Sequence, residues 1–371
     1  MLLSLTNTPR DYAWGSTTLL AALEGREPTG APEAEVWFGD HPSDPADIVG
    51  GGSLASVTEG ELPYLLKLLA AGSPLSIQVH PTIAQAQDGR VREAHLAEDD
   101  PHRNYRDDNH KPELIVALSE RFEALGGLRP VVDTLRLLDA FVDTPGVAAL
   151  RERLAGGDSA LGAVLAWLLS GDAAAEVADI ISALADAQSE EFGTALAAVR
   201  AISQTYPGDP GVVVALLMNH IVLARGEGIF LRAGLLHAYV SGLGVEIMAA
   251  SDNVLRGGLT PKHIDVDELL HVLDATPGLV PVIRPAGGAS VVEYPVTVGD
   301  FALQRITLSA EDVRVRVEGP SMVLATAGDV AVTSAGGTSA TVPVGQAVFV
   351  TAEESPLVLS GPGEAFIAQP G

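Results

Sequence analysis

Three patterns of apolar and polar residues follow one another along the chain and predict its main elements. From about residue 12 to residue 127, short apolar runs are interrupted by Gly, Pro, Asp and Ser. The runs LSIQVH (75–80) and ELIVAL (113–118) have the length of β-strands and either alternate or are apolar throughout. We therefore expect a β-rich first region, with one helix near residues 82–97.

A helical block is expected from about residue 130 to residue 205. This part is rich in Ala and Leu at helical spacing, and breaks such as DTPG, GGD and SGD divide it into four to six helices. It contains no histidine and no lysine. The block is therefore expected to contribute structure and to shape a substrate channel, and not to supply the reacting groups.

Strands return after the run YPGDPG (206–211) and a short helix, and residues 280–369 are again β-rich. Short apolar runs at even spacing between Gly and Pro turns are typical of a sandwich or jelly roll. No histidine follows His271, so this last region lacks the usual ligands of a catalytic metal. The pattern predicts a mainly β protein with a helical insertion. The predicted parts are a first catalytic β segment (1–128), a helical domain (129–205), a segment completing the catalytic domain (206–265) and a metal-free C-terminal β domain (266–371).

Composition excludes several classes of protein. The 371 residues are 47% apolar, which is enough for a large core in two or three domains. No apolar run is long enough to cross a bilayer, and the first residues do not resemble a secretory signal. The absence of cysteine excludes disulfides and thiolate metal sites. The expectation is a cytoplasmic protein that acts as a monomer.

The charge of the chain limits its partners and directs attention to its lysines. A net charge of −26 argues against nucleic acid and anionic membranes, because both require a basic surface. An anionic substrate would be repelled at long range, so its site must gather positive charge locally. Only three of the 22 basic residues are lysines, namely Lys67, Lys111 and Lys262. Lysine offers a compact charge and a shiftable pKa, so each is a candidate for a task that needs an amine.

Four residues in three segments have the side chains of a metal site. Gln78 and His80 are two positions apart in a predicted strand, so both side chains lie on one face. Glu113 opens a buried strand, and His237 follows a Gly turn between two strands. Taken singly, each fits an ordinary core or rim residue. Together they form a shell that suits Zn²⁺ with room for water or substrate, and that fits less well the two-His, one-carboxylate site of iron oxygenases.

Several segments closely resemble the type I phosphomannose isomerases, and the resemblance extends over most of the chain. It is carried by AEVWFGDHP (34–42), PYLLKLL (63–69), LSIQVHP (75–81), DDNHKPELIVAL (107–118), GEGIFLRAGLLHAY (226–239) and EIMAASDNVLRGGLTPKH (246–263). The runs QVHP, NHKPE and SDNVLRGGLTPK are together highly specific. The resemblance implies two cupin-type jelly-roll domains plus an α-helical domain, with one zinc ion per chain in the N-terminal cupin.

The resemblance also implies a role for individual residues. It places the zinc ligands on Gln78, His80, Glu113 and His237, and the essential arginine on Arg256. It places the other polar site positions on Lys67, Ser76, Lys111, Tyr239, Glu246, Asp252 and Lys262. One departure is Leu236, where many members have proline directly before the histidine, and this puts the fine geometry of the turn in doubt. Arg232, in the same turn, is interpreted as a solvated arginine at the rim.

The implied reaction interconverts mannose 6-phosphate and fructose 6-phosphate through a cis-enediol. A dication beside O1 and O2 would stabilise the enediolate or orient the substrate, and Arg256 would donate to the developing oxyanion. A base with a pKa near neutrality must reach C2. The candidates for this base are Lys111, Glu246, Asp252 and Lys262. The candidates for holding the phosphate are Ser76 together with Lys67, Lys262 or Arg256.

Two other classes of protein stay open at this point. An iron dioxygenase of the cupin type would bind a different metal, and the amide of Gln78 argues against it. A non-catalytic sugar-binding cupin would need a metal shell, but it would not need Arg256, Lys111, Glu246 and Asp252 together. Metal analysis separates the first class from the isomerase, and turnover of mannose 6-phosphate separates the second.

Overall fold

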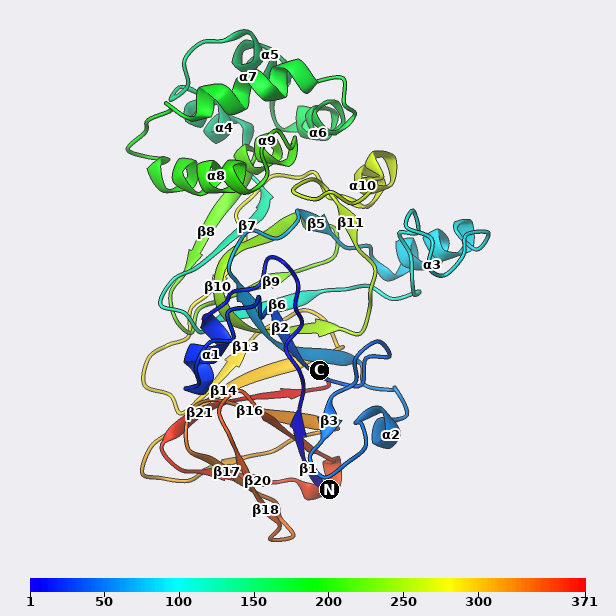
Figure 1. The fold of residues 1–371 in the computed structure, drawn as a ribbon, viewed down its shortest axis with the longest axis vertical. Helices are drawn as coiled ribbons and strands as arrows, with labels where there is room; N and C mark the ends of the chain where they lie inside the picture. Colours follow the sequence, from blue (N-terminus) through cyan, green and yellow to red (C-terminus); the bar gives the residue numbers. More distant parts are fainter.

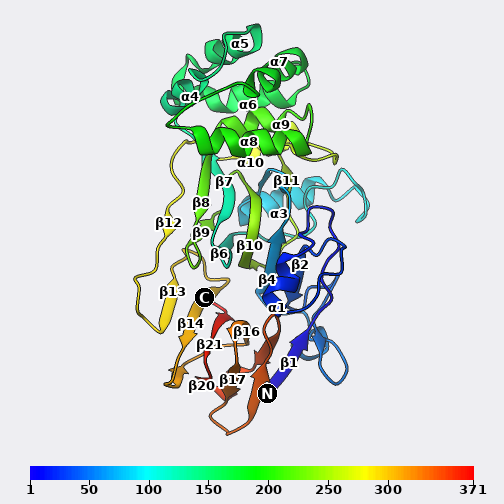
Figure 2. The ribbon, with the colours of Figure 1, turned by 60° about the vertical axis from the view of Figure 1, so that its left-hand side comes forward.

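The computed structural model describes all 371 residues, arranged in three tiers along the long axis of the molecule. Figures 1 and 2 show helices at one end, a ten-stranded sheet in the middle, and a seven-stranded and a four-stranded sheet at the other end. The protein is mainly β with several helices, which confirms the coarse prediction of the fold class. No helix has both the length and the apolar character needed to span a bilayer.

Strand β10 (His237–Ala249) organises the middle sheet. Its first residues pair with β5 (Gln78–Val79) and β7 (Phe122–Leu128), and its later residues pair with β4 (Tyr64–Ala71) and β6 (Glu113–Ala117). The exchange of partners occurs at Gly242, which has φ +121° and where a Cβ would lie 2.8 Å from the ring of Phe122. Glycine is therefore required where the strand bends from one set of neighbours to the next.

The remaining strands of the middle sheet bring distant parts of the chain together. They are β2 (Glu35–Phe38), β8 (Met218–Leu223), β9 (Gly228–Leu231), β11 (Leu255–Arg256) and β12 (Val282–Ile283). Strand β11 pairs with β5 so that Arg256 lies opposite Gln78. Strand β2 pairs with β4 so that Trp37 lies opposite Lys67.

Five α-helices occupy residues 131–205, where the periodicity predicts four to six. They are α4 (Val131–Leu138), α5 (Pro145–Leu154), α6 (Leu161–Leu169), α7 (Ala174–Leu184) and α8 (Gly193–Thr205). Helix α9 (Gly211–Leu216) follows and leads into β8. The buried side chains of these helices share one core with Ile77 and Leu255 of the middle sheet. The helical tier therefore packs directly onto the region of β5 and β11.

Helix α3 (Ile83–Arg92) is shorter than the helix expected over residues 82–97. It begins after Thr82, which forms a capping box with Gln85. Just beyond its end, the Glu93 carboxylate accepts hydrogen bonds from the backbone N–H groups of Asn104 and Tyr105, both at 2.9 Å. This contact folds the chain back on itself, so a long-range bond overrides the local helical pattern. The other short α-helices are α1 (Leu19–Glu24), α2 (Ala55–Thr58) and α10 (Val266–Val272).

The C-terminal region is a two-layered antiparallel sandwich. The seven-stranded sheet has the order β13 (Val291–Tyr294), β14 (Ala302–Leu308), β21 (Gly363–Gln369), β16 (Ser321–Gly328), β19 (Ala347–Val350), β1 (Leu2–Thr6) and β3 (Asp47–Ile48). The four-stranded sheet has the order β15 (Val313–Val315), β20 (Leu357–Ser360), β17 (Val330–Thr333) and β18 (Ser339–Val342). One apolar core lies between these two sheets, and a second core joins the seven-stranded sheet to the middle sheet.

The first strand of the chain belongs to the last region. Strand β1 pairs with β19, with Leu2 opposite Val350 and Leu5 opposite Ala347, and β3 pairs with β1. The predicted division assigned residues 1–128 as a whole to the catalytic β domain, so these pairings differ from it. The physical reason is that β19 offers an edge that β1 covers, burying Leu5 in the core that joins the seven-stranded sheet to the middle sheet. The apolar pattern of β1 predicts a strand and carries no information about its partner.

Candidate active site

A cavity of about 680 Å³ lies in the middle tier, between the strands and the end of the helical tier. Its wall includes Thr205 and Tyr206 from the end of α8, and the loop after β11 from Leu259 to Lys262. Eleven of the twelve predicted site residues line it: Lys67, Ser76, Gln78, Lys111, Glu113, His237, Tyr239, Glu246, Asp252, Arg256 and Lys262. The twelfth, His80, lies behind the wall and is 1% exposed.

Three buried side chains from three strands and turns converge at the base of this cavity. The ligand atoms of His80, Glu113 and His237 all lie within 4.8 Å of one another. His80 Nε2 is 3.2 Å from one Glu113 oxygen, and His237 Nε2 is 3.3 Å from the other. Glu113 lies opposite Leu231 at the end of β9, and His237 opens β10 after the turn that follows. His80 comes directly after β5, in which Gln78 lies opposite His237.

The hydrogen bonds of the two imidazoles leave both Nε2 atoms facing the carboxylate. His80 Nδ1 is 2.7 Å from the carbonyl oxygen of Asn253, and His237 Nδ1 is 2.9 Å from that of Leu235. A carbonyl accepts only, so each Nδ1 carries the proton and each neutral ring presents a lone pair at Nε2. Burial lowers the pKa of His80 to about 4, which keeps this ring neutral.

The resulting arrangement fits a bound cation. His80 Nε2 is fully buried and has no hydrogen-bond partner. Two nitrogen lone pairs and a carboxylate that face one another repel unless a positive ion lies between them. Burial favours the neutral form of Glu113, but the ammonium of Lys111 at 3.2 Å opposes this effect, and the pKa of Glu113 is held well below the usual range. The group is therefore an anionic carboxylate flanked by two imidazoles whose Nε2 atoms face it, the set of donors that zinc accepts.

Gln78 lies beside this group. Its backbone is paired with both His237 and Arg256, and its amide nitrogen donates to the Ser76 hydroxyl at 3.1 Å. That bond leaves the amide oxygen free to bind a cation. Its role as a fourth ligand stays a prediction.

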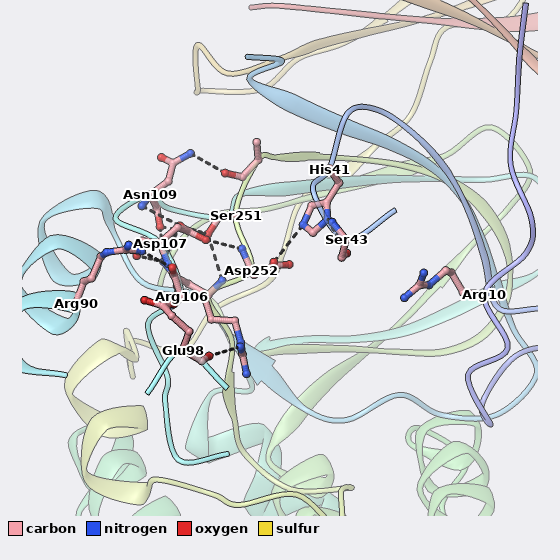
Figure 3. A network of polar contacts seen from close by, with 12 residues as sticks. Arg10, His41, Ser43, Arg90, Glu98, Arg106, Asp107, Asn109, Ser251 and Asp252 are labelled. Carbon is pink, nitrogen blue, oxygen red and sulfur yellow. Dashed lines mark hydrogen bonds and ion pairs between the residues drawn. The ribbon is translucent and has the colours of Figure 1, made fainter. Parts of the chain in front are cut away.

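The segments that carry the site are joined by a polar network around Asp107 and Asn253, part of which is shown in Figure 3. The Asn253 amide donates to the backbone oxygens of Asp107 and Asn109, at 3.0 and 2.8 Å. The Asp107 carboxylate accepts from the Ser251 hydroxyl at 2.8 Å and from the backbone N–H of Asp252 at 2.7 Å. Because Asn253 also orients His80, this network holds the DDNHKPE and SDNVLR segments as one unit.

Asp252 extends from this network toward His41, as Figure 3 shows. Its carboxylate is 3.1 Å from His41 Nε2, and His41 Nδ1 is 2.8 Å from the Ser43 hydroxyl. The hydrogen bond with His41 is the main cause that lowers the pKa of Asp252 below its ordinary value. Asp252 is therefore an oriented carboxylate, half-exposed at the wall of the cavity.

One wall of the cavity is a row of buried charges on neighbouring strands. The ammonium of Lys67 lies 3.3 Å from Glu246 and 3.7 Å from Glu35, and the Tyr239 hydroxyl donates to Glu246 at 2.8 Å. The indole N–H of Trp37 donates to Glu35 at 2.7 Å. One ammonium cannot neutralise two buried carboxylates, and burial with this excess negative charge raises the pKa of Glu246.

The cavity also carries cations without acidic partners. Arg256 and Lys262 line the cavity, and neither forms an ion pair with a carboxylate. Burial lowers the pKa of Arg256, and the charge of Arg106, which lies outside the cavity, lowers it further. Burial also lowers the pKa of Lys262, with smaller contributions from the charges of Arg256 and Arg106. In a chain with a net charge of −26, this is the local positive charge that an anionic substrate requires.

Comparison with known proteins places this site in a family. Residues 49–131 match the family model of the phosphomannose isomerase type I catalytic domain. The mannose-6-phosphate isomerase of Escherichia coli (strain K12) is 35% identical, over 97% of both chains, and that of Salmonella typhimurium (strain LT2) is 33% identical over the same share. The chain belongs to the type I phosphomannose isomerase family. A solved mannose 6-phosphate isomerase bound with zinc and yttrium has a TM-score of 0.88 at 32% identity, covering 100% of this chain and 99% of its own.

Several residues of this family member's site were missed by sequence reasoning. Glu35 and Trp37 hold Lys67, and His41 holds Asp252. All three stand in the segment AEVWFGDHP, which carries the resemblance but has no pattern that ties it to the cavity. Trp14 and Tyr206 also line the cavity. Their only sequence signal is their aromatic character.

The two positions in the turn before His237 have ordinary surroundings. Leu236 is buried in the core shared by the helices and the middle sheet, so an apolar side chain suits the position. Arg232 is half-exposed and forms an ion pair with Asp274 at 2.5 Å. It does not line the cavity, which agrees with its interpretation as a rim arginine.

Proposed function

We propose that this family member interconverts mannose 6-phosphate and fructose 6-phosphate through a cis-enediol, with one zinc ion per chain. The observation that carries the proposal is the buried set of His80, Glu113 and His237, which shares one cavity with the unpaired cations Arg256 and Lys262. This combination suits a substrate with a reacting carbonyl at one end and a phosphate at the other.

Four residues would hold the metal: His80, Glu113 and His237, with the amide oxygen of Gln78. Zinc, when bound by these residues, would supply a fixed positive charge that stabilises negative charge developing on the substrate. His80 and His237 each keep Nε2 available through the bond of Nδ1 to a backbone carbonyl. Lys111, 3.2 Å from Glu113, keeps that carboxylate ionised.

Glu246 is our candidate for the base that takes the proton from C2 and returns it to C1. Its raised pKa brings it closer to neutrality than an ordinary glutamic acid, and Tyr239 fixes the position of its carboxyl group. Asp252 is a weaker base because its pKa is lowered, so we assign it to accepting hydrogen bonds from sugar hydroxyls. Lys111 is occupied by Glu113, and Lys67 by Glu35 and Glu246.

The remaining cations divide between the two ends of the substrate. Arg256 lies in β11 directly opposite Gln78, so we assign its guanidinium to the oxyanion that develops near the metal. Lys262 is exposed at the mouth of the cavity, and we assign it to the phosphate together with the Ser76 hydroxyl.

The two β regions and their surroundings complete the proposal. We infer that both are cupin-type jelly rolls and that only the N-terminal one holds a metal, since the C-terminal one has no histidine after His271. Zinc analysis should therefore give one equivalent per chain. The monomeric state and the cytoplasmic location stay predictions, which size-exclusion chromatography and cell fractionation would test.

The experiment that tests the function is turnover of mannose 6-phosphate on one preparation, before chelation, after chelation and after return of zinc. We expect activity that the chelator abolishes and zinc restores. A folded, zinc-loaded protein without turnover would contradict the proposal and favour a sugar-binding protein. Full activity with iron and none with zinc would contradict the assignment of the metal.

A further inference from the structure

Asp209 forms a bridge between the helical tier and the loop that carries Lys262. It lies in the run YPGDPG between α8 and α9. One oxygen of its carboxylate accepts the backbone N–H groups of Gly211 at 2.7 Å and Leu259 at 3.0 Å. The other accepts the backbone N–H of Thr260 at 3.2 Å. Leu259 and Thr260 belong to the loop after β11, and both line the cavity.

Two glycines allow the two backbones to meet at this bridge. A Cβ on Gly258, which has φ +119°, would lie 2.4 Å from the Cα of Gly211. A Cβ on Gly211 would lie 2.6 Å from the backbone nitrogen of Leu259. Neither position has room for a side chain, so the loop and the start of α9 are in direct backbone contact.

The turn at this contact is conformationally unfavourable by itself. Leu259 has φ +56°, a left-handed conformation that costs free energy for a residue other than glycine. Such a conformation persists only where surrounding contacts hold it. The two bonds from the loop to Asp209 are contacts of that kind.

The loop before and after this turn is held in different ways. Arg256 and Gly258 are anchored in the sheet, because Arg256 pairs with Gln78, Gly257 donates to Ile77 at 2.8 Å, and Ile77 donates to Gly258 at 3.1 Å. Beyond Gly258, the backbone is held by Asp209 through Leu259 and Thr260. The position of Lys262 therefore depends on Asp209 much more than the position of Arg256 does.

We propose that Asp209 is a positioning residue that sets Lys262 for binding the substrate phosphate. The inference rests on the proposed function, in which Lys262 contacts that phosphate. If so, the helical tier contributes to substrate binding through the Asp209 carboxylate, which contacts neither the substrate nor the metal.

A carboxylate is needed at this position because its two oxygens receive three N–H groups. Asparagine has the same shape but only one accepting oxygen, and its amide nitrogen would face an N–H group of the loop or of Gly211. Asp209→Asn therefore removes at least one charge-assisted hydrogen bond and leaves a backbone donor unpaired.

The test compares kcat and KM for mannose 6-phosphate in the zinc-loaded wild type and in Asp209→Asn. We expect KM to rise about tenfold, as for one lost charge-assisted bond, with kcat changed by no more than about twofold and one zinc retained. A control for the chemical change is Asp179→Asn in the helical tier, where the carboxylate accepts the backbone N–H of Gly146 at 2.6 Å. This variant should leave KM unchanged.

A double-mutant cycle with Lys262→Ala shows whether Asp209 acts through Lys262. If it does, Asp209→Asn adds little to the KM of Lys262→Ala. Asp209→Ser, which is smaller and keeps a single accepting oxygen, should raise KM in the same way and serves if Asp209→Asn does not fold.

Three results would overturn the inference: an unchanged KM in Asp209→Asn, a fall in kcat alone, or additive effects in the cycle. Absence of turnover in the zinc-loaded wild type would instead overturn the proposed function itself, so the two failures are distinguishable.

Discussion

The middle sheet and the C-terminal sandwich are both antiparallel, but they bury different kinds of side chain. In the middle sheet and its connections, Lys67, His80, Glu113, His237 and Glu246 are each no more than 5% exposed. Between the two sheets of the sandwich, the buried side chains are almost all valine, isoleucine, leucine and alanine. The same kind of strand pairing therefore supports a reactive interior in one region and an apolar interior in the other.

The difference lies in the neighbours that each buried position receives. A buried charge costs free energy unless opposite charges or hydrogen bonds compensate it. In the middle sheet, the pairing of β10 with β4 and of β4 with β2 places Lys67 between Glu246 and Glu35. The sandwich has no such arrangement and is stabilised by apolar burial. Four substitutions test whether the middle sheet carries the reaction and the sandwich carries stability, and they are given in order of decreasing expected effect.

The largest effect is expected for Glu113→Gln in the middle sheet. The neutral amide removes the only anionic ligand of the proposed metal, so turnover should fall by at least about a hundredfold and zinc should be lost. Activity assays and metal analysis on the dialysed protein measure both changes. Retention of one zinc and of full activity would contradict the role of Glu113.

Arg256→Ala should lower turnover by about 10² to 10³ while zinc stays bound. The reason is that the guanidinium is assigned to the developing oxyanion, and no other cation lies in β11. Arg314→Ala, on the exposed face of the sandwich, is the matched control and should have no effect. Full turnover in Arg256→Ala would remove this residue from the mechanism.

Ile367→Ala tests the other side of the comparison. Ile367 is 1% exposed in the core of the sandwich, and the truncation should cost about 2–5 kcal/mol of unfolding free energy. The expected result is a lower melting temperature with unchanged kcat and KM at 25 °C. A change in KM would show that the sandwich communicates with the cavity.

The smallest effect is expected for His41→Ala, which removes the main partner of Asp252. The pKa of Asp252 is lowered in the folded protein, so the pair stabilises the fold above the ordinary pKa of 3.8, and this contribution is lost as the pH falls through the lowered pKa. Because the Asp252 side chain is 47% exposed and solvent screens it, the contribution should be below about 1 kcal/mol.

The pH series for His41→Ala is a set of thermal melts between pH 3 and pH 7. The melting temperatures of wild type and variant should differ above about pH 4 and converge as the pH falls below 3.8. A difference that grows as the pH falls below 3.8 would contradict the assigned sign.

The local features of this protein follow from patterns of neighbouring residues along the chain. Periodicity located the helices between residues 131 and 205, and turn residues at even spacing predicted the C-terminal strands, because these signals are contained in neighbouring residues. The scarcity of lysine and the i, i+2 spacing of Gln78 and His80 directed attention to residues that now line one cavity or lie directly behind it. The resemblance to a family then connected these segments.

The pairing of residues that are distant in the sequence follows from the folded structure and not from these local patterns. The apolar pattern of β1 does not predict that this strand pairs with β19. In the same way, the sequence does not predict that Glu35 pairs with Lys67, or that Asp209 accepts hydrogen bonds from the loop of Leu259 and Thr260. The physical reason is that strand pairing and charge compensation depend on separations in space, whereas hydrophobic periodicity depends on separations along the chain. Whether a lysine lacks a carboxylate partner, as Lys262 does, or is held by carboxylates, as Lys67 is, therefore depends on the folded structure.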